Sequence, residues 1–289
     1  MREQNEKEHC IDTCSLLEYN ITKCEVVKMK QENHYLELRN NTVVKANELI
    51  QKSRFSLSLQ QQKIVLYLIS QIMPYDEDFK LYEFSIIEFC KVCGIDYESG
   101  KNYADLKAAV KEIADKSVWI RLANGKQTLV RWIEKPYIDD NSGIIQIKLD
   151  ADMKPYLLQL KENFTKYELL WTLNFKSKYT IRLYELIKSI HYHDVFDYQK
   201  EFDLDELRRM LGAETYKTYQ TFKTRVLEPS VAEINAYSDK TIEYEPIKKG
   251  RAISKIKLYL SSKDTAERLK IQMQIERDFG LDQTSLFDN

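Results

Sequence analysis

The chain has 289 residues, more than one compact hydrophobic core usually organises, so two domains with tails are expected. Its 44 Lys and Arg residues nearly balance 45 Asp and Glu residues, and the net charge of −1 excludes both a uniformly basic nucleic-acid coat and an acidic disordered chain. The 7 glycines form no Gly-rich phosphate loop, which argues against a nucleotide-driven enzyme, and no cofactor is expected.

The sequence also bears on the compartment. No apolar run approaches the roughly 20 residues that cross a bilayer, and the charged N-terminal segment lacks a signal-peptide core. The 5 cysteines are an odd number, which fits reduced thiols better than disulfides. A cytoplasmic protein without a membrane partner is therefore expected.

The chain begins with a segment that lacks a clear hydrophobic period. Residues 1–41 hold 6 basic and 8 acidic residues, which predicts a flexible or loosely helical N-terminal arm. A short strand is predicted at Thr42–Val44. Ser58 then caps a predicted helix whose apolar residues recur at helical spacing. A second strand is predicted at Leu81–Phe84, followed by a helix that Ser85 caps.

An internal repeat is the most informative feature. The sequence Phe84-Ser85-Ile86 returns 118 residues later as Phe202-Asp203-Leu204. In each copy a capping residue follows an aromatic one, apolar residues follow at helical spacing, and a glycine ends the segment, at Gly94 and Gly212. Each copy therefore predicts a short helix that is capped at both ends.

A second helix and a β-hairpin follow each copy. Tyr103, Leu106 and Val110 correspond to Tyr219, Phe222 and Val226 in the second helix. The predicted strands after it are Ser117–Leu122 and Thr128–Tyr137 in the first copy, and Thr241–Pro246 and Ala252–Leu260 in the second. A strand at Gly143–Leu149 and a helix at Asp150–Leu160 are predicted to complete the first domain.

This order of elements is typical of the winged helix. The predicted fold class is α+β, with two tandem winged-helix domains, a flexible N-terminal arm and a C-terminal tail. The predicted boundaries are 1–41 for the arm, 42–162 for the first domain, 163–263 for the second domain and 264–289 for the tail.

In a helix-turn-helix the second helix lies in the major groove, so its outward face decides what the domain can bind. In the second copy this face and its flank carry cations, hydroxyls and an amide, and no acid: Lys217, Thr218, Gln220, Thr221, Lys223, Thr224 and Arg225. The hairpin turn adds Lys248, Lys249 and Arg251 around one glycine. Residues 217–257 hold 9 basic against 5 acidic residues, so this domain is predicted to be the main DNA reader.

The first copy is predicted to bind DNA more weakly or to form a dimerisation surface. Asp105 and Glu112 lie on the outward face of its second helix, where carboxylates would repel phosphates. The residues predicted to make secondary DNA contacts are Lys101, Asn102, Lys107, Lys111 and Lys126. The alternative interpretation of both copies is an ordinary solvated face, as on many Lys-rich helices.

Two separated motifs resemble the Rep_3-type plasmid replication initiators. The first is Val44–Ile50 followed by Phe55–Leu59 and Gln62–Leu66, and the second is Tyr219–Pro229 continuing into Glu233-Ile234-Asn235. The resemblance covers about residues 42 to 262. The arm, with its cysteines, departs from the family pattern.

The resemblance implies tandem winged-helix domains that bind double-stranded direct repeats, called iterons, at a plasmid origin. It also implies recruitment of the host helicase, and a homodimer that represses replication in equilibrium with a monomer that starts it. We expect a DNA-binding protein and no enzyme. The alternative is a winged-helix transcription repressor without a role in replication.

Three smaller motifs carry hypotheses of their own. Gln283, Leu286 and Phe287 resemble the peptide by which bacterial replication proteins dock on the sliding clamp, and the alternative is that Leu286 and Phe287 pack back on the second domain. His191-Tyr192-His193 resembles the metal pair of rolling-circle nickases, but it lies at a predicted helix end, where a histidine commonly adds a favourable charge. The Cys90 and Cys93 pair has zinc-site spacing, but Cys93 is predicted to lie in the core, and no metal site is expected.

Overall fold

The computed structural model describes residues 30, 33–93, 95, 100–122, 124–191 and 197–279, without the side chains of residues 100–102. The described residues from Arg39 to Phe279 belong to one compact body. Within the described parts of the chain, no helix is both long and apolar enough to cross a membrane.

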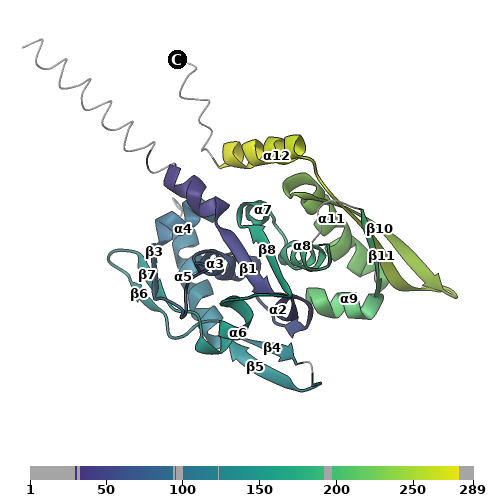
Figure 1. Ribbon diagram of the computed structural model, residues 1–289, viewed down its shortest axis with the longest axis horizontal. Helices are drawn as coiled ribbons and strands as arrows, with labels where there is room; N and C mark the ends of the chain where they lie inside the picture. The colour runs from purple at the N-terminus through teal and green to yellow at the C-terminus, as the bar shows by residue number, and fades with distance from the viewer. Residues whose placement is uncertain are drawn as a thin grey trace, which may run out of the picture. The chain divides into compact units, whose positions relative to one another are not determined.

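The first winged-helix unit is built around a buried helix. Strand β1 (Thr42–Ala46) leads through α2 (Asn47–Gln51) and β2 (Ser53–Arg54) to α3 (Leu59–Ser70) (Figure 1). Ser58 accepts a hydrogen bond from the Gln61 amide while the Gln61 side chain accepts one from the Ser58 amide, which confirms the predicted cap. All residues of α3 from Gln61 to Ser70 are buried, so the helix forms the centre of this core.

The repeated part of the first unit follows. It consists of β3 (Tyr82–Ser85), α4 (Ile86–Cys93), α5 (Gly100–Asp115), and the hairpin of β4 (Ser117–Arg121) and β5 (Gln127–Arg131). The amide of Glu88 donates to the Ser85 hydroxyl at 3.0 Å, as the predicted cap requires. Leu106, Val110 and Ile113 of α5 are fully buried.

Two of the predicted elements in this unit were wrong in extent. The strand predicted at 128–137 is two strands, β5 and β6 (Tyr137–Asp139), which belong to different sheets of order β2-β4-β5 and β3-β7-β6. Trp132 and Ile133 are buried between them, and this packing ends β5. Strand β7 (Ile144–Ile147) precedes a 3₁₀ turn, η1 (Ala151–Met153), and α6 (Lys154–Leu157), which stops before Leu160 because Leu158 is extended.

The segment after α6 joins the two units. Strand β8 (Phe164–Glu168) pairs antiparallel with β1, and α7 (Leu170–Leu173) leads to α8 (Lys178–Ile190). Helix α8 packs against α2 and α3 of the first unit and against α9 and α11 of the second. In Figure 1 it lies between these two groups of elements. The predicted boundary at residues 162/163 therefore falls just before a strand that pairs with the first unit.

The second unit repeats the helix pair of the first. Strand β9 (Tyr198–Asp203) leads into α9 (Leu204–Leu211), which begins 118 residues after α4. Asp203 caps α9 at its N-terminus, and Gly212 ends it with a φ of 67°, a left-handed conformation that glycine adopts without strain. These features confirm the predicted cap and turn.

One long helical stretch and a hairpin complete the second unit. The helical stretch consists of α10 (Tyr219–Phe222), a π-helical turn, η2 (Lys223–Leu227), and α11 (Glu228–Tyr237). Strands β10 (Lys240–Lys249) and β11 (Ala252–Ser262) form the hairpin. The segment predicted as a tail begins with a helix, α12 (Thr265–Asp278), whose capping box is formed by Asp264 and Glu267.

The two units differ in how their strands pair. In the second unit β9 pairs with β11, the second strand of its own hairpin, so β11 is the central strand of the sheet. In the first unit the corresponding strand β3 pairs with β7, and the hairpin pairs with β2 instead. The outer face of β2-β4-β5 is thus set apart from the helix pair of the first unit.

Candidate nucleic-acid interface

The helix predicted to enter the major groove begins at a capped residue. Thr218 accepts a hydrogen bond from the Thr221 amide at 3.1 Å and starts α10. Phe222 and Val226 are fully buried, while Tyr219 is half-buried. These three residues are the ones predicted to face the core. Their burial determines which side of the helix faces outward.

The outward side consists of polar and cationic side chains. Those that are exposed are Lys217, Thr218, Gln220, Thr221, Thr224 and Arg225, as the helical spacing predicts. Lys223 is half-exposed, and its ammonium group lies 3.3 Å from a carboxylate oxygen of Glu228. From Lys217 to Leu227 the chain contains no acidic residue, so a phosphate or a base edge would meet no repelling carboxylate within this segment.

Two hydroxyls on this face are directed by the helix backbone. Thr221 donates to the carbonyl oxygen of Thr218, and Thr224 donates to that of Gln220, both at 3.0 Å. With the proton held this way, each side chain offers lone pairs and a methyl group to a ligand. Such groups accept hydrogen bonds from base amino groups or contact a thymine methyl group.

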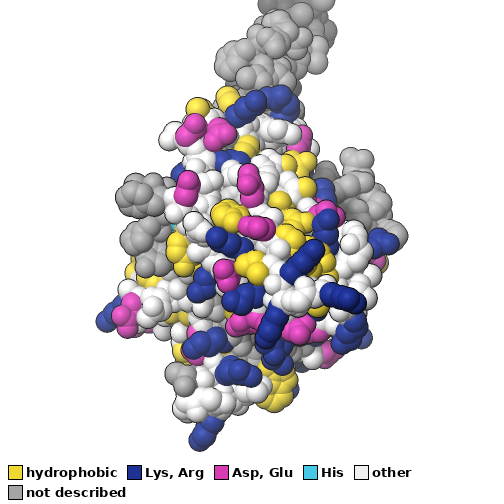
Figure 2. All heavy atoms as spheres, turned by 90° about the vertical axis from the view of Figure 1, so that its right-hand side faces the viewer, with side chains coloured by type: hydrophobic (Ala, Val, Ile, Leu, Met, Phe, Trp, Pro, Cys, Tyr) yellow, Lys and Arg dark blue, Asp and Glu magenta, His cyan; other side chains and the backbone are white. Residues whose placement is uncertain are grey.

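The hairpin of the second unit carries the predicted basic turn. Gly250 has a φ of 66°, and Lys248, Lys249 and Arg251 are all exposed around it. Figure 2 shows the side of the molecule on which this unit lies, where dark blue Lys and Arg side chains are interspersed with magenta Asp and Glu side chains. Long cationic side chains at a hairpin tip can reach phosphates beside a helix held in a groove.

The corresponding surface of the first unit is more mixed. The Lys107 ammonium group lies 2.6 Å from Asp140, and this hydrogen bond raises the pKa of Lys107. Lys111 is exposed beside Glu112, whose carboxylate accepts from Gln61. Lys126 is exposed at the hairpin turn, whereas the side chains of Lys101 and Asn102 lie outside the described residues. Part of the positive charge on α5 is thus already neutralised by the protein itself.

The smaller motifs are only partly within the described residues. His191 is the C-terminal cap of α8 and is buried beside the Lys240 ammonium group, 3.3 Å away, while Tyr192 and His193 are outside the described residues. Cys90 and Cys93 are buried on α4, which confirms the predicted core position of Cys93. Gln283, Leu286 and Phe287 are also outside the described residues.

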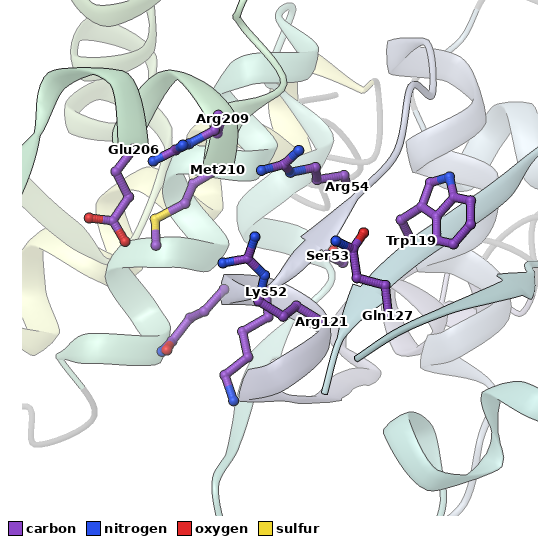
Figure 3. A pocket seen from close by; sticks show the side chains of 10 residues that line it. Lys52, Ser53, Arg54, Trp119, Arg121, Gln127, Glu206, Arg209 and Met210 are labelled. Atoms are coloured by element: carbon purple, nitrogen blue, oxygen red, sulfur yellow. The ribbon is translucent and has the colours of Figure 1, made fainter. Parts of the chain in front are cut away.

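A cationic pocket of about 280 Å³ was missed by the sequence analysis. It is lined by residues of α2, β2, β4, β5 and α9, among them Lys52, Arg54, Arg121 and Arg209 (Figure 3). Arg121 and Arg209 lie far from Lys52 and Arg54 in the chain, and no local charge run marks the set. The pairing of β2 with β4 brings in Arg121, and the packing of α9 against β2 brings in Arg209.

Known proteins resemble this chain over most of its length. Residues 42–188 match the family model described as Initiator Replication protein, WH1, and residues 203–260 match the model described as Initiator Rep protein, WH2. A curated Replication initiation protein from Escherichia coli is 29% identical over 217 residues, and the match covers 72% of this chain. This chain spans 66% of the length of that relative, slightly less than two thirds.

A solved structure shows the same fold. The crystal structure of Pi initiator protein in complex with iteron DNA matches with a TM-score of 0.65 and 20% sequence identity, over 78% of this chain and 99% of that one. Together with the two family models, this likeness confirms the predicted α+β fold of two tandem winged-helix units.

Proposed function

Because the chain belongs to the Initiator Replication protein family, we propose that it starts plasmid DNA replication by binding repeated double-stranded sites, or iterons, at a plasmid origin. It acts as a binding protein and not as an enzyme, in the cytoplasm. The observation that carries the proposal is the exposed, acid-free face of α10 and η2, in a unit whose β10–β11 hairpin ends in an exposed basic turn.

The roles of the residues follow from their chemistry. Arg225 presents the forked donors of its guanidinium group to base edges, and Gln220 presents its side-chain amide. Thr221 and Thr224 present methyl groups and oxygen lone pairs. Lys217, Thr218 and Lys223 lie toward the phosphates at the start and flank of the helix. Lys248, Lys249 and Arg251 neutralise phosphates beside it and supply affinity that does not depend on sequence.

The first unit is assigned a secondary role. Its candidate contacts are Lys101, Asn102, Lys107, Lys111 and Lys126, and the same unit forms a homodimer that represses replication in equilibrium with an active monomer. The pairing of Lys107 with Asp140 supports the weaker DNA contact, because that ion pair must be broken or shared before Lys107 binds phosphate.

Host proteins complete the proposal. The chain recruits the host helicase to the origin, and Gln283, Leu286 and Phe287 dock on the sliding clamp. Burying the two apolar side chains in a groove contributes roughly 1.5–3 kcal/mol each.

The experiment is a footprint of the purified protein on its own plasmid, joined to a maintenance assay. We expect protection of repeated sites at the origin, and loss of plasmid maintenance when Arg225→Ala removes the protection. Protection of a single promoter with normal plasmid maintenance in the variant would instead indicate a transcription repressor.

A further inference from the structure

The outer face of the sheet β2-β4-β5 has an unusual composition. Val118 and Ile120 of β4 point inward and are fully buried, so the alternate residues point outward. Trp119 lies opposite Arg54 on one side and Leu129 on the other, and Arg121 lies opposite Gln127. The outward residues are Arg54, Ser117, Trp119, Arg121, Gln127, Leu129 and Arg131. None of them is acidic.

The pocket continues this face toward the second unit. Figure 3 shows Arg54 and Arg121 extending from the strands and Arg209 from α9 toward the space between them, with Trp119 on the same lining but farther from α9. Glu206 is the one carboxylate among the residues that line the pocket. Among the described residues, Arg54, Arg121 and Arg209 have no ion-pair partner.

Hydrogen bonds from one buried arginine hold the walls of the pocket in place. The buried Arg182 guanidinium donates to the Met210 carbonyl oxygen at 2.6 Å and lies 3.5 Å from the carbonyl oxygens of Ile50 and Ser53. These contacts join the end of α9 to α2 and β2. The cations at the rim are thus kept close together by the fold, although they repel one another, and such a cluster favours an anionic ligand.

Trp119 narrows the choice of ligand. It is 49% exposed, whereas Trp132 and Trp171, the other two of the 3 tryptophans, are 1% and 6% exposed. An exposed aromatic ring flanked by guanidinium groups is suited to a polyanion whose bases are free to stack, and bases inside a duplex are not. A second copy of the chain fits poorly, because a twofold contact would place these arginines against one another without carboxylates.

We propose that the outer face of β2-β4-β5, with the pocket at its edge, binds single-stranded DNA. A base stacks on Trp119, and Arg54, Arg121 and Arg209 hold the phosphates that run into the pocket. This site is distinct from the duplex-binding face of α10 and does not depend on it. An initiator with both sites holds a duplex repeat and an opened strand at the same time.

The test measures binding of the full-length protein to a labelled thymine homopolymer and, in parallel, to an origin duplex. Trp119→Ala should weaken homopolymer binding by about tenfold, the loss typical of one stacked base. The pair Arg54→Ala with Arg121→Ala should also weaken it, because two phosphate contacts are lost, and should make binding less dependent on salt. Trp119→Phe should retain most of the affinity, because its ring still stacks. Duplex binding by these variants should be unchanged, which also shows that they are folded.

Two controls separate this site from the proposed duplex site. Arg225→Ala should weaken the duplex and leave the homopolymer unchanged, and Lys270→Ala, an exposed cation on α12, should alter neither. In the wild type, the homopolymer should quench the fluorescence of the exposed Trp119. Unchanged homopolymer affinity in the Trp119 and arginine variants would overturn the proposal. So would a shift of Trp119→Ala from dimer to monomer with normal homopolymer binding.

Discussion

Lys45 and Glu185 form a buried ion pair between β1 and α8. Their charged atoms are 2.6 Å apart, with side-chain exposures of 5% and 2%, and Glu185 also accepts from the Tyr167 hydroxyl at 2.6 Å. Burial lowers the pKa of Lys45, and the neighbouring Glu185 opposes that change. The pair is tolerated in the core because each charge has a close partner.

We predict that Lys45→Met destabilises the protein by roughly 3–5 kcal/mol, because it leaves the Glu185 carboxylate buried without its cation. The measurement is the free energy of unfolding in urea. The matched control is Lys52→Met, which removes a partly exposed ion pair with Glu48 and should cost less than about 1 kcal/mol. Equal losses in the two variants would contradict the prediction.

The buried thiol of Cys93 makes the free energy of unfolding depend on pH in the alkaline range. Burial raises the pKa of its thiol from 9.0 to about 12. Between these values the unfolded chain releases a proton that the folded chain retains, so stability is complete below pH 9.0 and falls as the pH rises toward 12. The slope for this one group is about 1.4 kcal/mol per pH unit.

The measurement compares wild type with Cys93→Ala by urea unfolding at a series of pH values above 9.0. The variant starts from a lower stability, because it loses buried volume, but its stability should fall less steeply. Buried Lys45, whose pKa burial lowers and whose charged neighbours are Glu185 and Arg182, acts in the opposite direction in both proteins and cancels in the comparison. If the free energy of unfolding fell equally steeply with pH in both proteins, Cys93 would not be the cause of the pH dependence.

At the scale of elements, the basic turn of the β10–β11 hairpin should act differently from the helix. Lys249 lies at the tip with an exposed side chain. In the proposed function it contacts a phosphate and no base. Lys249→Ala should therefore weaken specific and random duplexes alike and lower the slope of log affinity against log salt by about one. Binding titrations at several salt concentrations measure this. A selective loss for the origin sequence would show that the hairpin contributes to base reading.

The C-terminal segment is a separable element in its proposed role. The double variant Leu286→Ala with Phe287→Ala should abolish retention of the sliding clamp in a pull-down, because the truncated side chains no longer fill the apolar groove of the clamp. The control is Leu269→Ala, which truncates a leucine that is 54% exposed on α12. Retention of the clamp by the double variant would remove this part of the proposal.

The elements that were predictable from the sequence are those whose signals are local. Ser58, Ser85 and Asp203 cap their helices, and the outward face of α10 follows from the spacing of Phe222 and Val226. Such signals involve residues within one or two turns of each other. They depend little on the rest of the fold.

The elements that were missed depend on distant contacts. The break between β5 and β6 is caused by the burial of Trp132 and Ile133, and Ile133 bridges to Leu149. Strand β3 pairs with β7 and not with the hairpin of its own unit, and the local sequence pattern does not indicate which of these partners it takes. The cationic pocket combines residues that only tertiary packing unites. Helix α12 was the exception, since its capping box at Asp264 and Glu267 was a local signal that the prediction of a tail overlooked.

At the scale of the whole molecule, α8 couples the two winged-helix units. Its Arg182 bonds to the end of α9, and its Tyr184 and Lys188 bond to Asp239 at 2.8 Å. On its other side Glu185 holds Lys45 of β1. These buried polar contacts are satisfied only when both units are in place, so the units should unfold together.

Trp119 and Trp132 lie in the first unit and Trp171 lies in α7 of the joining segment, so all 3 tryptophans are outside the second unit, which allows a test of this coupling. Urea unfolding of the wild type should give the same transition by tryptophan fluorescence and by circular dichroism. Arg182→Met leaves the carbonyl of Met210 without its donor and should cost at least about 2 kcal/mol and separate the two transitions. Separate transitions in the wild type would contradict the coupling.

The proposed function depends above all on one interaction, in which the second unit reads duplex DNA through the exposed face of α10 and η2. The most direct measurement is the affinity of wild type, Arg225→Ala and the control Lys270→Ala for an origin repeat and for a random duplex at one salt concentration. We predict that Arg225→Ala loses roughly 1–3 kcal/mol of binding free energy on the repeat and less on the random duplex, while the control changes neither affinity. Equal affinities of wild type and Arg225→Ala for the repeat would contradict it.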